Sequence, residues 1–330
     1  MSTPRTYSRR RVLSILAAAT ILPLGKAQAR VPNMQPYRWQ GLALGAEADL
    51  TLYAETESVA MEAIAASLAE IDRLERIFSL HRPDSAISQL NRVGTLPAPP
   101  VEFVELLSLA LTLAERTDGR FDPSIQPLWQ LYAKAGPAAA ELDEGQLKAT
   151  QALVDWRNVA LSPSVVTFGR PGMQLTLNGI AQGYISDRIA ILLQGRGFTH
   201  ALVNLGELQA LGSRADGSPW QIGLSAPHDR ADLRETELLS SGAMATSAAA
   251  GLSFDRTGNY NHIVNARSLQ CADPRFSVTV RSQSAAVADG LSTVGTLMLQ
   301  ERDAFTDLLR QFVARAIIID EQQAPLVRLG

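Results

Sequence analysis

The sequence contains a single cysteine, Cys271, in 330 residues, and this scarcity excludes several kinds of site. One cysteine cannot form an intramolecular disulfide or a cysteine-rich metal centre. Any metal ion must therefore be held by oxygen atoms or imidazole rings. His81, His200 and His228 show no metal-ligand spacing, and we interpret them as surface or packing residues.

Strong charge and long apolar runs are also missing. The formal net charge is only -3, without the basic excess that is typical of nucleic-acid-binding proteins, so we expect no nucleic-acid partner. The apolar run from Ile15 to Leu24 is well short of the roughly 20 residues that a membrane-spanning helix requires. We therefore expect no stable membrane anchor. The Walker and Rossmann glycine spacings are both absent, so neither motif provides a nucleotide site.

The first 29 residues predict an export signal. Arg9 and Arg10 precede the apolar run, and residues 27–29, Ala-Gln-Ala, match the small-x-small pattern that signal peptidase reads. Paired arginines are typical of the twin-arginine route, which exports folded proteins. We therefore expect cleavage after Ala29 and a periplasmic mature chain of residues 30–330.

The full sequence has the composition of a soluble globular protein, with 46% hydrophobic and 19% charged residues. Strand and helix patterns interleave without a long linker. These patterns predict α/β (α+β) architecture, a single compact unit of mixed sheets with flanking helices in two lobes. The expected strands are 37–46, 48–53, 173–177, 201–205, 220–224, 237–239, 276–281 and 316–320, the expected helices are 59–78, 101–116, 184–194 and 284–299, and 243–250 is expected to form a turn facing a ligand.

The stretch 174–183, Gln-Leu-Thr-Leu-Asn-Gly-Ile-Ala-Gln-Gly, is the best candidate for a binding junction. Alternation over 173–177 predicts a half-buried strand, and apolar residues at helical spacing from Tyr184 predict a helix. Gly179 and Gly183 allow a ligand to approach the backbone, and a helix N-terminus attracts anions. A phosphate group is the simplest occupant, and a plain strand-to-helix connection is the alternative.

A second constellation lies at Asp289 and Thr293. Residues four apart lie on the same face of a helix, so this carboxylate and this hydroxyl can converge on one point. Both are hard oxygen donors of the kind that Mg²⁺ accepts. A helix cap or a chance pair is the alternative interpretation.

Taken together in chain order, these and other motifs resemble the FAD:protein FMN transferases, the ApbE-like family. The resemblance runs from about Leu44 to Thr293, nearly the whole mature chain. The matching motifs are 44–46 (Leu-Gly-Ala), 82–85 (Arg-Pro-Asp-Ser), 117–123 (Thr-Asp-Gly-Arg-Phe-Asp-Pro), 177–183, 204–206 (Asn-Leu-Gly), 245–247 (Ala-Thr-Ser), 262–263 (His-Ile), 277–280 (Ser-Val-Thr-Val) and 288–293 (Ala-Asp-Gly-Leu-Ser-Thr).

The resemblance implies a Mg²⁺-dependent enzyme that transfers the FMN half of FAD to a Ser or Thr hydroxyl and releases AMP. The implied partner is an acceptor flavoprotein subunit of a membrane redox complex. The implied metal ligands are Asp289, Thr293 and the carbonyl of Ala181, with Asp289 and His262 as catalytic residues and His262 as proton acceptor. The implied FAD contacts are Leu44, Arg120, Phe121, Asp122, Asn178, Gly179, Gln182, Gly183, His262 and Ile263.

The sequence departs from the family pattern at several of these motifs. Asn178 replaces a glycine, Gln182 a lysine, Glu207 the second glycine of a pair, and Asn265 an aspartate, and residues 44–46 replace Met-Gly-Thr. Losing a lysine weakens the positive field around bound phosphates. Two alternatives therefore stay open, namely a periplasmic FAD-binding or carrier protein with little transfer activity, and a Mg²⁺-dependent FAD pyrophosphatase.

Overall fold

The structure, a computed structural model, describes residues 19–21, 34–43 and 46–330. Its centre is an eight-stranded sheet built from β2 (Gln35–Ala43), β3 (Ala46–Ala54), β7 (Ala201–Asn204), β8 (Leu208–Leu211), β11 (Gly242–Ala248), β12 (Phe276–Ser282), β13 (Arg315–Asp320) and β14 (Gln323–Leu329). The strand order is β14-β13-β12-β11-β8-β7-β3-β2, and neighbouring strands are antiparallel. Antiparallel strands with separate helices make this an α+β fold.

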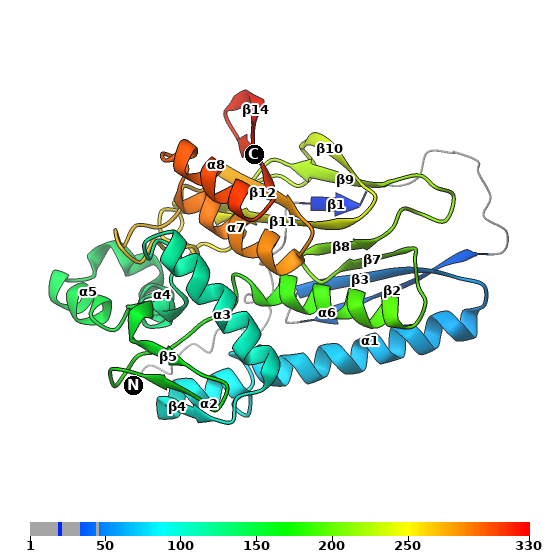
Figure 1. Cartoon of the computed structure of the whole chain (residues 1–330). Coiled ribbons are helices and arrows are strands. Elements are labelled where there is room, and N and C mark those ends of the chain that lie inside the picture. Colours follow the sequence, from blue (N-terminus) through cyan, green and yellow to red (C-terminus); the bar gives the residue numbers. More distant parts are fainter. Residues whose placement is uncertain (1–18, 22–33, 44–45) are drawn as a thin grey trace, which may run out of the picture.

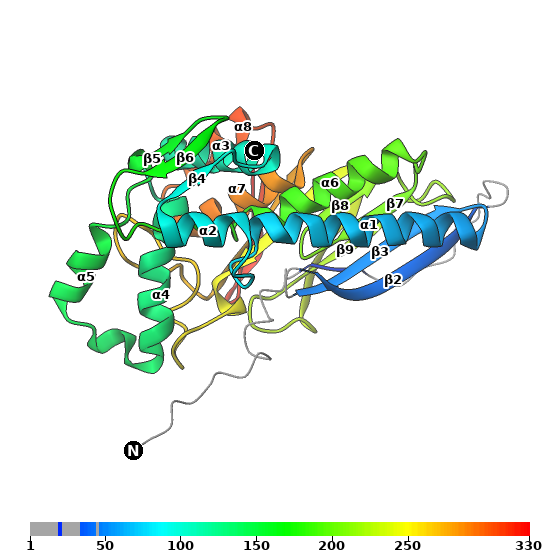
Figure 2. The ribbon, with the colours of Figure 1, turned by 90° about the horizontal axis from the view of Figure 1, so that it is seen from below.

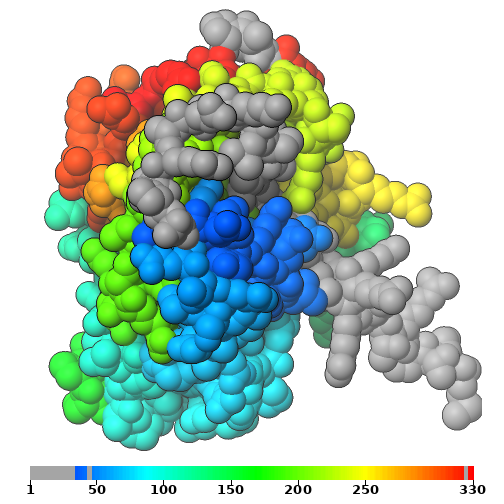
Figure 3. Space-filling model, turned by 90° about the vertical axis from the view of Figure 1, so that its right-hand side faces the viewer, coloured from blue at the N-terminus to red at the C-terminus, as the bar shows by residue number. Residues whose placement is uncertain are grey.

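Helices cover one face of this sheet (Figures 1 and 2). They are α1 (Glu57–Phe78), α6 (Ala181–Gly195), α7 (Ala285–Leu297) and α8 (Arg302–Gln311). Helix α7 packs on β11 and β12, and α6 lies beside α1. The apolar stripe of α1, which includes Ile64, Ile71 and Leu74, is buried as helical periodicity predicts. Figure 3 shows the end of the molecule where β2, β3 and α1 reach the surface.

A second, three-stranded sheet packs on the opposite face. It consists of β1 (Ala19–Ile21), β9 (Trp220–Ser225) and β10 (Leu233–Leu239), and its core includes Trp220 and Ile222. Strand β7 is therefore buried on both faces. Its Leu202 joins this second core, whereas Val203 joins the main core on the helical side. Alternate residues of a strand point to opposite faces, which explains the continuous apolar run in this strand.

The remaining elements form a smaller lobe beside the main sheet. They are α2 (Ala86–Val93), β4 (Thr95–Pro97), α3 (Val101–Arg116), η1 (Pro123–Ile125), α4 (Gln126–Ala135), η2 (Gly136–Glu141), α5 (Glu144–Gln151), η3 (Trp156–Asn158), β5 (Val159–Leu161), β6 (Val165–Phe168) and, in the second half of the chain, η4 (Ala249–Gly251). Leu128, Tyr132 and Val264 lie in its separate core. The predicted arrangement in two lobes is confirmed.

Two predicted elements differ from the structure. Residues 173–177 form no strand, because the side chain of Asn91 takes the place of a neighbouring strand: it donates to Leu175 O (2.8 Å) and accepts from Leu175 N (2.7 Å). The small residues 243–248 form the sheet strand β11 and not a turn. Their size suits the close packing of α7 over this strand. Helix α8 and the small sheet of β4, β5 and β6 were not predicted.

The predicted export signal lies mostly outside the described residues, and only 19–21 of it is described, as β1. Arg9 and Arg10 are among the residues outside. None of the helices in residues 34–43 and 46–330 combines the length and apolar character that crossing a bilayer requires.

Hydrogen bonds and close packing join the first half of α6 to the start of α7. The carboxylate of Asp187 on α6 accepts hydrogen bonds from Ser284 Oγ (2.7 Å), Ala285 N (2.7 Å) and Ala286 N (3.0 Å), and so caps α7. A Cβ atom on Gly183 would lie 2.2 Å from the carbonyl oxygen of Ala285. Glycine is therefore required at 183 for the two helices to approach.

We expect Gly183→Ala to destabilise the protein by about 1–3 kcal/mol, because the new methyl group overlaps backbone that cannot move aside. The melting temperature should fall by several degrees. Gly195→Ala at the other end of α6 is the matched control, since a Cβ there meets no atom within 4 Å. Equal melting temperatures for Gly183→Ala and the wild type would contradict this packing.

Candidate functional site

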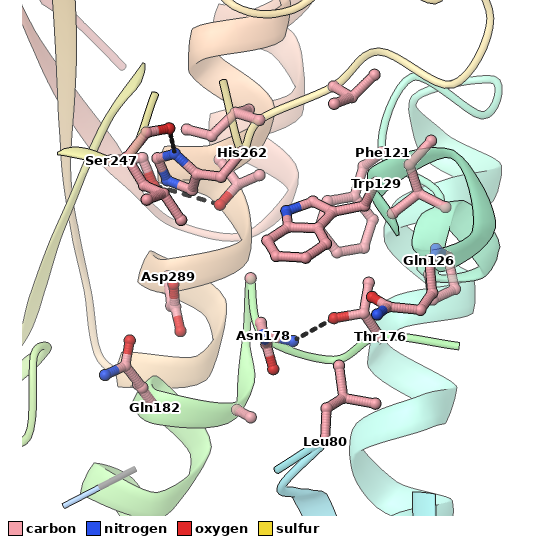
Figure 4. Close-up of a pocket in the computed structure, with 18 of the residues that line it drawn as sticks. Leu80, Phe121, Gln126, Trp129, Thr176, Asn178, Gln182, Ser247, His262 and Asp289 are labelled. Carbon is pink, nitrogen blue, oxygen red and sulfur yellow. Dashed lines mark hydrogen bonds between the residues drawn. The ribbon is translucent and has the colours of Figure 1, made fainter. Parts of the chain in front are cut away.

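A cavity of about 360 Å³ lies between the two lobes. Its walls come from α4, the segment 176–182, β11, the loop 251–264 and α7. Figure 4 shows Asp289 and His262 on one side of the cavity, with Phe121 and Trp129 facing them from the smaller lobe. Residues far apart in the sequence are therefore gathered by the fold around one space.

Most of the sequence-predicted site residues line this cavity. They are Phe121, Asp122, Asn178, Gly179, Ala181, Gln182, His262, Ile263, Asp289 and Thr293. Leu44 lies outside the described residues. The structure thus brings together the predicted metal ligands and the predicted catalytic histidine.

Arg120 and Gly183 differ from the prediction. The guanidinium group of Arg120 pairs with Glu301 at 2.6 Å and donates to Thr117 O, and the residue does not line the cavity. Gly183 is also outside the lining, where it allows the close approach of α6 and α7. Neither residue is placed to contact a ligand in this cavity.

The N-terminus of α6 already faces an anion that belongs to the protein. The backbone N–H of Gly183 donates to Asp289 Oδ2 at 3.1 Å, so Asp289 satisfies one of the unpaired donors of the first helical turn. We predicted a ligand phosphate at this turn. In the structure the carboxylate of Asp289 accepts the hydrogen bond from Gly183 N–H that a phosphate was expected to accept. A phosphate would therefore lie further out in the cavity.

Asp289 shares the cavity with a second buried carboxylate, that of Glu207, which follows β7. Asp289 is 4% exposed and Glu207 is 6% exposed. Burial raises the pKa of both groups, and the negative charge of Asp289 raises the pKa of Glu207 further. Glu207 Oε2 is buried without a hydrogen-bond partner. No lysine or arginine occurs among the described residues that line the cavity, so no such side chain there offsets the cost of ionising both groups.

The donor set fits a hard divalent cation. Asp289 and Thr293 lie one turn apart on α7, and both face the cavity together with Ala181 at the start of α6. Ser247 Oγ lies 3.2 Å from Thr293 Oγ1 and 2.7 Å from Ser292 Oγ, which holds the hydroxyl groups in a cluster. Carboxylate, hydroxyl and carbonyl oxygens suit Mg²⁺, and the buried, unpartnered oxygen of Glu207 is a further donor of this kind.

His262 is held as a neutral base. Its Nδ1 lies 3.1 Å from the carbonyl oxygen of Leu252, and since a carbonyl can only accept, Nδ1 carries the proton. The lone pair of Nε2 is then available to accept a proton. Burial lowers the pKa of His262 to about 4, so the ring stays neutral at physiological pH.

An aromatic wall formed by Phe121 and Trp129 completes the cavity. Trp129 packs edge-on against Phe254 with ring centroids 5.2 Å apart. The sequence analysis assigned no role to Gln126 or Ser247. Gln126 and Trp129 are three residues apart on α4, a spacing that places both on one helix face.

Two other residues have roles that the sequence did not indicate. Asp122 lines the cavity, but its carboxylate accepts from Ser124 N (2.8 Å), Ser124 Oγ (2.6 Å) and Trp156 N (3.1 Å). Asp122 therefore shapes the loop more than it offers a ligand contact. His81, which we interpreted as a surface or packing residue, is exposed and lies at the edge of the cavity.

Comparisons with known proteins identify the family. Residues 44–318 match the ApbE family. A Vibrio cholerae protein named FAD:protein FMN transferase is 30% identical over 246 residues, which is 71% of this chain and 73% of the relative. The chain belongs to the ApbE family. A Treponema pallidum protein with the same name is 29% identical over 269 residues, 73% of this chain and 72% of the relative. The family resemblance of the sequence motifs is confirmed.

Solved ApbE structures have the same fold. The ApbE protein from Thermotoga maritima superimposes with a TM-score of 0.77 at 26% identity, covering 90% of this chain and 97% of that one. The flavin transferase ApbE from Vibrio cholerae gives a TM-score of 0.74 at 21% identity, with 89% and 96% covered. The predicted fold class is therefore confirmed for this ApbE protein.

The low pKa of His262 predicts a pH dependence of stability. Between pH 6.5 and about 4 the unfolded chain binds a proton at this residue and the folded protein does not. The contribution of His262 to the free energy of unfolding should therefore be fully present above pH 6.5 and be lost as the pH falls towards 4, by a total of about 3 kcal/mol.

Urea unfolding of the wild type and His262→Gln at several pH values measures this contribution. In His262→Gln the free energy of unfolding should depend less on pH between 6.5 and 4 than it does in the wild type. His81→Gln, a matched change of an exposed histidine, should keep the pH dependence of the wild type. Identical pH slopes for the wild type and His262→Gln would show that the ring is not held neutral by the fold.

Proposed function

We propose that this protein is an FAD:protein FMN transferase that moves the FMN half of FAD to a Ser or Thr hydroxyl of an acceptor protein and releases AMP. The observation that carries the proposal is the convergence of Asp289, Thr293 and the neutral His262 on one aromatic-walled cavity. The names of the relatives in the ApbE family support the same activity.

Asp289, Thr293 and the carbonyl oxygen of Ala181 would hold Mg²⁺ in this proposal. When bound, Mg²⁺ would neutralise charge on the pyrophosphate oxygens that develops during phosphoryl transfer. The protein itself contributes position: α7 fixes Asp289 and Thr293, and the hydrogen bond from Gly183 N–H fixes the carboxylate of Asp289.

His262 would act as the general base. Its Nε2 takes the proton of the acceptor hydroxyl, whose oxygen forms a new bond to the FMN phosphorus as the bond from that phosphorus to the bridging oxygen breaks. AMP leaves with the bridging oxygen. The hydrogen bond between Nδ1 and Leu252 O keeps the ring in the tautomer that this step requires.

The flavin or the adenine ring of FAD would pack against Phe121 and Trp129, and Asn178 and Gly179 would lie along the pyrophosphate. Gln182 Nε2 donates to Leu205 O at 3.1 Å, so this side chain also supports the turn after β7. An uncharged residue here leaves the phosphates dependent on the metal for their main positive charge.

We further propose that the enzyme works in the periplasm after export by the twin-arginine route. The support is the arginine pair at Arg9 and Arg10 and the cleavage pattern ending at Ala29. A flavoprotein subunit of a membrane redox complex is the proposed acceptor, because such a subunit would expose its hydroxyl group in the same compartment.

The activity is tested with purified enzyme, FAD, Mg²⁺ and a co-expressed acceptor. We expect the intact mass of the acceptor to increase by one FMN less water, with AMP formed in equal amount. Formation of AMP and free FMN without a mass change would support the pyrophosphatase alternative. Binding of FAD without AMP formation would support the carrier alternative.

Asp289→Asn should lower the rate of transfer at least about 100-fold, because the amide keeps the shape of the side chain but loses the negative charge that holds the metal. Asp303→Asn on the surface of α8 is the control and should transfer FMN at the wild-type rate. Wild-type activity in a folded Asp289→Asn variant would remove Asp289 from the metal site.

Trp129→Ala should weaken FAD binding about tenfold by removing a stacking surface. Trp129→Phe, which keeps an aromatic face, should bind within a few-fold of the wild type. Titration of each protein with FAD, followed by flavin fluorescence, measures the difference. Unchanged affinity in Trp129→Ala would place the ring system of FAD elsewhere in the cavity.

A further inference from the structure

Glu207 is a buried acidic residue of the cavity that the proposed metal site does not yet use. It is 6% exposed, and its Oε2 is buried without a hydrogen-bond partner. Burial and the negative charge of Asp289 raise the pKa of Glu207, and the backbone N–H of Thr246 opposes this shift. Keeping this carboxyl group ionised in such surroundings costs several kcal/mol, so its protonated form is favoured unless a positive group is supplied.

Hydrogen bonds to its carbonyl oxygen fix the backbone of Glu207. Its carbonyl oxygen accepts from Leu205 N (3.3 Å) and from Ser186 Oγ (3.0 Å), which ties the turn between β7 and β8 to helix α6. The side chain is therefore held at the cavity beside Asp289, whose negative charge acts on it. Both carboxyl groups face one space, and the described lining supplies no lysine or arginine there.

We propose that Glu207 is an additional ligand of the divalent cation, bound directly or through one water molecule. This inference rests on the metal site of the proposed function and extends it. Asp289 alone would leave a bound Mg²⁺ with one unit of positive charge, whereas Asp289 and Glu207 together neutralise it. Affinity for such ions rises with the number of charged ligands.

The additional carboxylate has opposite effects on the binding of the cation and on the binding of FAD. It lets the protein hold the cation before FAD arrives, because both negative charges come from the chain. It also leaves less positive charge for the pyrophosphate of FAD, next to the uncharged Gln182. Glu207 therefore strengthens metal binding and weakens the electrostatic attraction of FAD. A residue with only a structural role would not change the two affinities in opposite directions.

The test uses Mn²⁺ as a spectroscopic substitute for Mg²⁺ and the full protein without FAD. Mn²⁺ affinity is measured by electron paramagnetic resonance for the wild type, Glu207→Gln and Glu207→Gly. We expect both variants to bind Mn²⁺ at least about tenfold more weakly. Glu237→Gln, a change on the surface strand β10, is the matched control and should bind Mn²⁺ as the wild type does.

FAD affinity at saturating Mn²⁺ is the second readout, and we expect it to increase in both Glu207 variants. Circular dichroism verifies folding, and the glycine variant provides the measurement if the glutamine variant does not fold. Equal Mn²⁺ affinity in the wild type and the folded variants would overturn the inference, as would a loss of affinity for both Mn²⁺ and FAD. Failure of the wild type itself to bind Mn²⁺ would instead contradict the metal site of the proposed function.

Discussion

A pair of buried carboxyl groups without a cationic partner is the constraint on which the site depends. Asp289 and Glu207 are both buried, and the described residues around the cavity include no lysine or arginine. Folding alone does not supply a reason to bury two carboxylates together, since each loses hydration without gaining a partner of opposite charge. In the proposed function, a divalent cation between them would offset this cost, and it would also supply positive charge to the pyrophosphate of FAD.

The rest of the fold positions this charge. Helix α7 holds Asp289 over the sheet, and its start is fixed to α6 by the cap from Asp187 and by the close contact at Gly183. The same contact directs the Gly183 N–H at Asp289. The smaller lobe then closes the cavity with the aromatic wall of Phe121 and Trp129. One junction between two helices therefore determines both stability and the geometry of the site.

Much of this architecture could be predicted from local pattern. The long apolar periodicities of α1, α3 and α7 identified those helices, and the ordered motifs identified the ApbE family. Alternation over 173–177 was misinterpreted as a strand, because it reports one buried face and cannot reveal that Asn91 replaces the neighbouring strand. The pairing of Glu207 with Asp289 was not predictable either, since it arises only when the turn after β7 packs beside α7.

The location of the cation tests the central claim most directly. Crystals soaked with Mn²⁺ and measured at a wavelength where manganese scatters anomalously would show where the ion binds. The account predicts one strong anomalous peak about 2.0–2.3 Å from a carboxylate oxygen of Asp289 and from Thr293 Oγ1, on the side of the cavity that Glu207 faces. A cavity without a peak, or a peak bound by other residues, would contradict the claim that these buried carboxylates exist to hold a metal ion.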